Sequence, residues 1–242
     1  MKKPQAIIFD VDGTLIDHER AAQQALLTVK SARREFDEVN IERLHELWTE
    51  DFNTFWKPVV TGEISLEENR VIRFLRIFRS LGLDSSREDA AETALIYGRT
   101  YDSEIRGIPG ASELIRELRK DGIGIGIVTN NTYDNQIVKL KKSGYEGQFD
   151  YIVTSERTGA MKPDPAIFES ALELSGKPAE STVMIGDSFG EDIIGAHNAG
   201  LKPVWFNRFN KPHPTAQFKF VTLNSYLPTE SALRAILNSG TA

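Results

Sequence analysis

The sequence predicts an α/β protein whose parallel sheet is doubly wound and whose chain carries one all-helical insertion. Short apolar segments bounded by turn residues alternate with segments of helical periodicity, which is the pattern of βαβ units. Between Asp17 and Arg106 this alternation stops, and only helical patterns remain. The chain has 242 residues, 40% of them hydrophobic, so it is long enough to bury a core in both parts.

The expected strands are apolar along nearly their whole length. They are Ala6–Phe9, Ile123–Val128, Tyr151–Val153, Val183–Ile185 and Val204–Phe206. Because such strands are buried on both faces, we expect helices on both sides of the sheet. This arrangement is Rossmann-like, and ligands of such sheets bind at the carboxyl ends of the strands.

The segment after the first strand has the spacing of amphipathic helices. Apolar residues recur there at i, i+3, i+4 and i+7, for example at Val71, Phe74, Leu75 and Phe78. The alternating pattern resumes at Gly107-Ile108-Pro109-Gly110, whose glycine and proline residues suit a connector. We therefore expect a catalytic core domain at residues 1–16 and 107–242, and a helical cap domain over the active site at residues 17–106.

The composition excludes several classes of function. With 29 Lys and Arg against 35 Asp and Glu, the chain lacks the broad positive field that binds nucleic acid polymers. The absence of cysteine excludes disulfides, thiolate catalysis and cysteine zinc sites. No apolar stretch approaches the ~18 residues of a membrane span or forms a signal peptide. We expect a soluble cytoplasmic monomer or homodimer that acts on a small molecule.

Two carboxylates follow the first expected strand, in Phe9-Asp10-Val11-Asp12-Gly13-Thr14-Leu15. A glycine after the second carboxylate permits a sharp turn, which would aim both side chains into the crevice of the sheet. A surface Asx turn is the alternative, since Asp-Gly is common in turns. The position at a strand end favours a catalytic role.

Polar residues also follow the second strand, as Thr129-Asn130-Asn131. The Thr129 hydroxyl and the Asn130 amide could hold a phosphate at the start of the next helix, although an ordinary helix N-cap has the same appearance. Further along the chain, Lys162 lies between a loop and a helix, where it could offer a point charge to phosphoryl oxygens. Most lysines, however, are simply solvated surface residues.

The fourth strand leads into a glycine turn that is rich in acids, Gly186-Asp187-Ser188-Phe189-Gly190-Glu191-Asp192. Magnesium binds through one or two carboxylates and keeps several waters. Asp10 and Asp187 lie at the ends of strands that we expect to be neighbours. The sequence therefore predicts a Mg²⁺ site between them.

These elements, taken in order, resemble the motifs of the haloacid dehalogenase-like hydrolases. The matching residues are Asp10-x-Asp12-Gly13-Thr14, Thr129, Lys162 and Gly186-Asp187-x4-Asp192. The resemblance extends over almost the whole chain. Two further segments, Lys162-Pro163-Asp164-Pro165-x-Ile167-Phe168 and Gly195-Ala196-x-Asn198-Ala199-Gly200, are similar to the phosphatase branch, whose helical cap is inserted after the first motif.

The resemblance implies a mechanism. Asp10 would attack phosphorus to give an aspartyl phosphate, and Asp12 would protonate the leaving oxygen and then activate water. Magnesium would be held by Asp10, Asp187 and the backbone carbonyl of Asp12. Thr129 and Lys162 would bind the phosphoryl oxygens together with Asn130, while Asp192 would orient Lys162 or a metal-bound water.

The alternatives to a phosphatase are a dehalogenase, a phosphomutase and a catalytically silent regulatory protein. Haloacid dehalogenases lack the second aspartate of the first motif, so Asp12 argues for phosphoryl transfer. A phosphomutase keeps that aspartate and remains an alternative, because it differs only in where the phosphoryl group goes. A catalytically silent regulatory protein is disfavoured, since every catalytic position of the motifs is filled.

The expected cap carries the information about the substrate. Aromatic residues recur there at helical spacing, which favours core packing over a nucleobase platform; they are Trp48, Phe52, Phe55 and Trp56. Their surroundings loosely resemble the pyrimidine nucleotidase group, through Trp48-x2-Asp51-Phe52 and Gly62-Glu63-Ile64-Ser65. A nucleoside 5′-monophosphate is therefore the leading substrate, with phosphoglycolate or a sugar phosphate as alternatives.

Two further sets of charged residues belong to the expected cap, one on a helix and one where the chain enters the cap. An arginine run with a spacing of three residues is expected to be a solvated helix face rather than an anion-steering surface; it comprises Arg70, Arg73, Arg76 and Arg79. Asp17 and Glu19 either line the entrance to the cap or cap a helix. The four histidines have no metal-ligand spacing, and we assign them no catalytic role.

Overall fold

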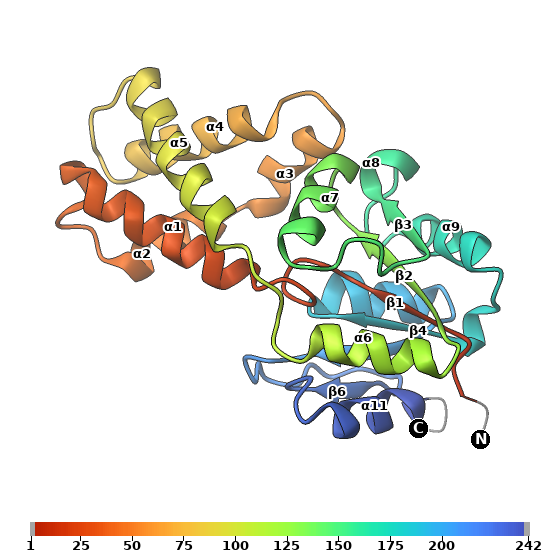
Figure 1. Ribbon diagram of the computed structural model, residues 1–242. Helices are drawn as coiled ribbons and strands as arrows, with labels where there is room; N and C mark the ends of the chain where they lie inside the picture. Colours follow the sequence, from red (N-terminus) through yellow and green to blue (C-terminus); the bar gives the residue numbers. More distant parts are fainter. Residues whose placement is uncertain (1–2, 240–242) are drawn as a thin grey trace. The chain divides into compact units, whose positions relative to one another are not determined.

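The computed structural model describes residues 3–239, except for the side chains of Phe52 and Asn53. These residues form two compact units (Figure 1). The core unit comprises the chain up to Asp17 and from Gly107 onward, and the helical unit is His18–Arg106. Asp17 thus belongs to the core unit, whereas the sequence-based boundary falls after residue 16.

A parallel sheet of six strands, in the order β3-β2-β1-β4-β5-β6, forms the centre of the core unit within residues 3–239. The strands are β1 (Ala6–Phe9), β2 (Gly124–Thr129), β3 (Tyr151–Thr154), β4 (Thr182–Gly186), β5 (Lys202–Phe206) and β6 (Val221–Leu223). The doubly wound parallel fold with an all-helical insertion is therefore confirmed. The sequence pattern missed β6, because its three residues are too few to show a hydrophobic period.

The register of the sheet brings the predicted motifs to one edge. Phe9 at the end of β1 pairs with Ile127 of β2 and with Ile185 of β4. The backbone N–H of Asp10 continues the ladder by donating to the Ile185 oxygen over 2.9 Å. The segments that follow β1, β2 and β4 consequently begin at the same level, where the carboxyl ends of parallel strands form a crevice.

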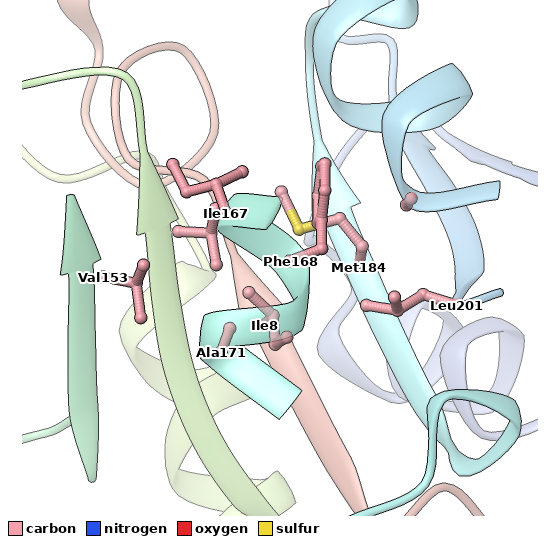
Figure 2. Packing of buried hydrophobic residues seen from close by; sticks show 9 residues of the cluster. Ile8, Val153, Ile167, Phe168, Ala171, Met184 and Leu201 are labelled. Atoms are coloured by element: carbon pink, nitrogen blue, oxygen red, sulfur yellow. The ribbon is translucent and has the colours of Figure 1, made fainter. Parts of the chain in front are cut away.

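Helices cover both faces of this sheet (Figure 1). The helices of the core unit are α6 (Ala111–Lys120), α7 (Tyr133–Lys142), α8 (Ser155–Thr158), α9 (Pro165–Ser175), α10 (Gly195–Asn198) and α11 (Thr229–Leu237), with the 3-10 helix η2 (Ala179–Ser181) and the π-helix η3 (Phe189–Ile194). Figure 2 shows Ile167, Phe168 and Ala171 of α9 packed toward Ile8 and Met184 of the sheet. On the other face, α6 packs against β2 and α11. Helices thus cover both faces of the sheet, as the apolar strands predict.

The helical unit consists of helices packed on one another. They are α1 (His18–Ala32), α2 (Ile41–Thr49), α3 (Phe52–Val60), α4 (Leu66–Ser80) and α5 (Arg87–Glu104), with the short turn η1 (Arg34–Phe36). The longest of them, α5, packs against α1 and α4, and it begins with a capping box between Ser86 and Asp89. In the part of the chain that the structure describes, no helix is both long and apolar enough to cross a membrane.

The aromatic residues of the helical unit form its core, as their helical spacing favours. Trp48 is only 4% exposed and lies 5.2 Å from the ring of Phe74 and 4.1 Å from that of Tyr97. Trp56 is also buried, and Phe55 is half-buried. The side chain of Phe52 lies outside the described part of the chain. The buried rings offer no platform on which a nucleobase could stack.

The expectation that the arginine run is a solvated face is wrong for Arg73. This side chain is buried and stacks on the Trp48 ring, with its guanidinium carbon 3.6 Å from the ring centroid. It also donates a hydrogen bond to the Trp48 backbone oxygen. Burial lowers the pKa of Arg73 to about 10. A flat guanidinium can be buried in this way because the aromatic ring and the carbonyl replace part of its hydration.

The two segments that connect the units lie side by side within the core unit. Ile16 and Gly107 form an antiparallel bridge, and the Ile108 N–H donates to the Leu15 oxygen over 2.8 Å. The Tyr145 hydroxyl donates to the same oxygen over 3.2 Å. A side chain at residue 107 would meet this hydroxyl at 2.7 Å, so the close approach requires glycine there.

Candidate active site

A tight turn directs the first motif toward the edge of the sheet. After β1 the chain folds back, so that the Gly13 N–H donates to Ile16 and the Ile16 N–H donates to Val11, each over 2.9 Å. Gly13 has a φ of +93°, a conformation that residues with a Cβ rarely adopt. A Cβ atom on Gly13 would lie 2.7 Å from the Asp187 carboxylate. Glycine therefore lets the first and fourth motifs approach each other.

Lys162 lies between two carboxylates in a buried triad. Its Nζ atom is 2.6 Å from Asp10 Oδ1 and 2.6 Å from Asp192 Oδ1, and it donates to the Val128 oxygen over 3.2 Å. The Lys162 side chain is only 2% exposed. Although burial disfavours the ammonium ion, the two carboxylates outweigh it and raise the pKa of Lys162, which stays charged.

Burial acts on Asp10 in the opposite direction to Lys162, because it disfavours the ionised form of an acid and so raises the pKa. Burial, with smaller contributions from the charges of Asp192 and Asp12, raises the pKa of Asp10 from 3.8 to about 7, although Lys162 opposes the shift. The nucleophile expected from the sequence is therefore a carboxylate whose ionisation is costly in the absence of another cation.

The acids of the fourth motif complete a cluster of carboxylates. One oxygen atom from each of Asp10, Asp187 and Asp192 lies within 4.8 Å of the others. Asp192 is held in place by the Ser188 N–H, which donates to its Oδ2 over 3.0 Å. Oxygen donors at this spacing are the chemistry that Mg²⁺ requires, and the excess negative charge favours a cation. These residues thus fit a magnesium ion.

The cluster contains one acid, Asp192, that the sequence does not place among the metal ligands. Asp187 accepts from the Thr14 hydroxyl over 3.5 Å, close to Asp10, whereas the Asp12 side chain is turned toward α7. This orientation is compatible with the expectation that Asp12 contributes to a metal site through its backbone carbonyl. Asp192 belongs to the carboxylate cluster, but its Oδ1 atom is bound to Lys162.

Three donors surround the Asp12 carboxylate. Lys139 Nζ lies 2.8 Å from Oδ1 and 3.0 Å from Oδ2, and Gln136 Nε2 donates to Oδ2 over 2.9 Å. The Asn131 amide donates to Oδ2 over 3.1 Å. Gln136 and Lys139 are site residues that the sequence motifs do not predict. The available signal was their i, i+3 spacing on the helix after the second motif, which places both on one face.

The second motif lies beside these groups. The Thr129 hydroxyl is buried and accepts from Gln136 Nε2 over 2.9 Å, which leaves its own proton to be donated elsewhere. Asn130 instead holds the loop of the third motif, since it accepts from the Lys162 N–H over 2.7 Å and donates to the Lys162 oxygen over 3.0 Å. Asp17, at the end of the first segment, pairs with Arg208.

The chain matches the family model of the haloacid dehalogenase-like hydrolases over residues 4–200. It therefore belongs to this family of hydrolases, and the residues of the site carry the motifs of the family.

Named relatives include phosphatases with different substrates. The chain is 29% identical to the glyceraldehyde 3-phosphate phosphatase of Pyrococcus furiosus over 206 residues, 85% of this chain and 82% of that protein. It is 38% identical to the pyrimidine 5′-nucleotidase YjjG of Escherichia coli over 127 residues, 52% of this chain and 56% of that protein. The crystal structure of the HAD-hydrolase YfnB of Bacillus subtilis, bound to magnesium, is similar with a TM-score of 0.75 and 27% identity, covering 96% of this chain and 100% of that one.

Proposed function

We propose that this hydrolase is a Mg²⁺-dependent phosphatase that cleaves a small phosphomonoester through an aspartyl phosphate on Asp10. The observation that carries the proposal is the contact between Asp10 and Lys162 within a cluster of further carboxylates. A buried ammonium ion beside the nucleophile provides fixed positive charge at the point where the phosphoryl group would arrive. Asp12, the acid that dehalogenases lack, supplies a proton for an oxygen leaving group.

The reaction would proceed in two displacements. An oxygen of Asp10 forms a bond to phosphorus as the bond to the leaving oxygen breaks, and that oxygen takes a proton from Asp12. Asp12, now a carboxylate, then accepts a proton from water as the water oxygen attacks phosphorus. The bond between phosphorus and Asp10 breaks, so phosphate departs and both carboxyl groups return to their starting states.

The remaining residues would bind the phosphoryl group. Lys162 and the Thr129 hydroxyl offer donors to its oxygens, and preorganised donors of this kind are worth roughly 3 kcal/mol each in other enzymes. A magnesium ion bound by Asp10, Asp187 and the backbone carbonyl of Asp12 would reduce the repulsion between carboxylate and phosphate. Asp192 would keep Lys162 in place, in agreement with the 2.6 Å contact between them.

A nucleoside 5′-monophosphate is our leading substrate, because of the resemblance to the pyrimidine nucleotidase group and the similarity to YjjG. A sugar phosphate or a related phosphorylated metabolite is the second candidate, favoured by the similarity to a glyceraldehyde 3-phosphate phosphatase over more of the chain. A phosphomutase would use the same residues.

The test is phosphate release from a panel of nucleoside monophosphates, sugar phosphates, glyceraldehyde 3-phosphate and phosphoglycolate. Each assay is run with Mg²⁺ or chelator on three proteins: the native chain, Asp10→Asn, and Asp134→Asn as a control that removes an exposed carboxylate. We expect release that needs Mg²⁺ and that Asp10→Asn reduces at least 1,000-fold, because the amide cannot act as the nucleophile.

Release that persists in Asp10→Asn would contradict the mechanism. Absence of release from every compound would contradict the phosphatase assignment. In that case, a transferred phosphoryl group detected by phosphorus NMR would indicate a mutase, and no reaction at all would indicate a silent protein.

A further inference from the structure

Helix α7 is unusual in which side chains it buries. Beside the apolar Leu140 it buries Gln136 fully and Lys139 to 4% exposure, whereas the neighbouring Ile137 and Val138 are 36% and 51% exposed. A helix that covers a sheet normally turns its apolar residues inward and its charges outward. An inverted pattern of this kind is expected where function overrides packing.

Both buried side chains of α7 end at the same carboxylate. Asp12 Oδ2 lies 2.9 Å from Gln136 Nε2, 3.0 Å from Lys139 Nζ and 3.1 Å from Asn131 Nδ2. Lys139 Nζ also lies 2.8 Å from Oδ1. Together these contacts use about all the acceptor sites of the carboxylate, so Asp12 is fixed in position. The Lys139 ammonium group contacts both oxygens and so fixes the orientation of the carboxylate plane as well.

Gln136 links this carboxylate to the second motif. Its Nε2 atom donates to Asp12 Oδ2 and to Thr129 Oγ1, each over 2.9 Å. The opposite atom of the amide, Oε1, is buried and has no hydrogen-bond partner. The amide is therefore oriented so that its nitrogen contacts Asp12 and Thr129, although its buried oxygen then lacks a hydrogen-bond donor. As a result, the proton-transferring carboxylate is held at a fixed distance from the hydroxyl that would bind the phosphoryl group.

We infer that Lys139 is a positioning residue, which together with Gln136 holds the Asp12 carboxylate beside Thr129 so that Asp12 can protonate the leaving oxygen. This inference rests on the phosphatase function proposed above. General acid catalysis requires the proton to lie within hydrogen-bond reach of the departing atom, and a small displacement of the acid lowers the rate strongly. Lys139 acts only through Asp12 and does not touch the substrate.

The dependence on the leaving group distinguishes this role from a structural one. An alkyl phosphate needs protonation as its oxygen departs, whereas p-nitrophenolate leaves unprotonated. The quantity to measure is kcat/KM, which reports the first displacement. For Lys139→Met we expect a loss of about 100-fold with an alkyl phosphate and of less than about 3-fold with p-nitrophenyl phosphate, since general acid catalysis is worth about 100-fold or more.

Three further proteins complete the experiment. Lys139→Arg, which keeps a cation at this position, is expected to recover at least one-third of the alkyl phosphate activity. Lys141→Met is the matched control, because Lys141 lies on the same helix with a side chain that is 67% exposed, and we expect it to behave as the native chain. Lys139→Gln, which keeps the polarity, takes the place of Lys139→Met if the latter does not fold by circular dichroism.

Equal losses with both substrates would overturn the positioning role, as would no loss with either. These results are distinct from failure of the proposed function, which would appear as a lack of activity in the native chain itself. A rise in alkyl phosphatase activity in Lys139→Met would also overturn the inference, since it would mean that Lys139 holds Asp12 away from the substrate.

Discussion

Asp10, Lys162 and Asp192 bring two carboxylates and one ammonium ion together in a buried position, so one negative charge remains uncompensated. Moving a charge from water into the protein interior is unfavourable in free energy, and a buried group avoids part of this cost because its pKa shifts toward the neutral form. The raised pKa of Asp10, about 7, is the sign of this imbalance. Protein stability should therefore depend on the charge of this one residue.

We predict that Asp10→Asn stabilises the metal-free protein above pH 7. Because the folded state raises the pKa of Asp10 from 3.8 to about 7, it prefers the protonated acid. Stability is lost as pH rises from about 4 to 7, where the unfolded chain ionises and the folded chain does not. We expect the free energy of unfolding in chelator at pH 8 to rise by up to about 4 kcal/mol in Asp10→Asn.

Urea unfolding at pH 8 and pH 4.5 measures this difference, with Asp134→Asn as the exposed control. The gain should shrink to less than half at pH 4.5, since there the carboxyl group of Asp10 is mostly protonated in the folded native chain. An equal gain at the two pH values would mean that the amide stabilises the site for a reason other than charge.

At the scale of single residues, the sequence predicted the identity of the groups better than their contacts. The sequence predicts Asp10 and Asp187 from motifs at strand ends and Lys162 from a motif before a helix, and the structure brings the three close together. The contacts of Asp12 with Gln136 and Lys139 could not be predicted, because the partners are more than 120 residues apart in the chain and no local pattern records such a pairing.

At the scale of the elements, the packing of α2 against α4 and α5 shows that the aromatic residues of the helical unit form its core. Trp48 of α2 lies between Phe74 of α4 and Tyr97 of α5, and Arg73 stacks on its ring. The periodicity of the sequence predicted core packing for this ring. It could not predict that an arginine would be buried with it, because burial of a charge depends on partners that come from another helix.

We predict that Trp48→Ala lowers the free energy of unfolding by about 4 kcal/mol, the usual cost of removing a large buried aromatic side chain. Trp48→Phe, which keeps a ring beneath Arg73, should lose less than half as much. Leu95→Ala is the control for an exposed apolar side chain on α5, and it should be nearly neutral. Urea unfolding provides the measurement.

Trp48→Phe also separates packing from substrate recognition. If the ring only packs, this variant should leave the KM for nucleoside monophosphates within about 3-fold of the native value. A large rise in KM for nucleotides but not for sugar phosphates, without loss of stability, would show that the ring contacts a base and would contradict our interpretation.

At the scale of the whole molecule, the chain leaves and re-enters the core unit at neighbouring points. Ile16 and Gly107 pair with each other, and the Tyr145 hydroxyl fixes the Leu15 backbone beside them. These contacts, like the sheet and the helices on its two faces, belong to the core unit alone. The sheet of the core unit is thus complete without any strand from the helical unit.

We predict that the core unit folds by itself when residues 18–106 are replaced by a short Gly-Ser linker. The linker closes a gap whose two ends are already bridged, so its entropic cost is small, and each core helix keeps the contacts that it makes within the core unit. Circular dichroism should show the spectrum of a mixed α/β protein, and thermal unfolding should remain cooperative. The control is the full chain with the same linker inserted between Asp17 and His18, which separates the effect of the linker from the loss of the helical unit.

The same protein tests the prediction that the helical insertion acts as a cap that selects substrates. If it does, the core unit alone should keep measurable Mg²⁺-dependent hydrolysis of p-nitrophenyl phosphate but should lose its preference among nucleotides, sugar phosphates and phosphoglycolate, because residues outside the core would supply that preference. An unchanged order of preference would place selection in the core unit. A core unit that aggregates, while the linker control folds, would instead show that the helical unit is required for the stability of the sheet.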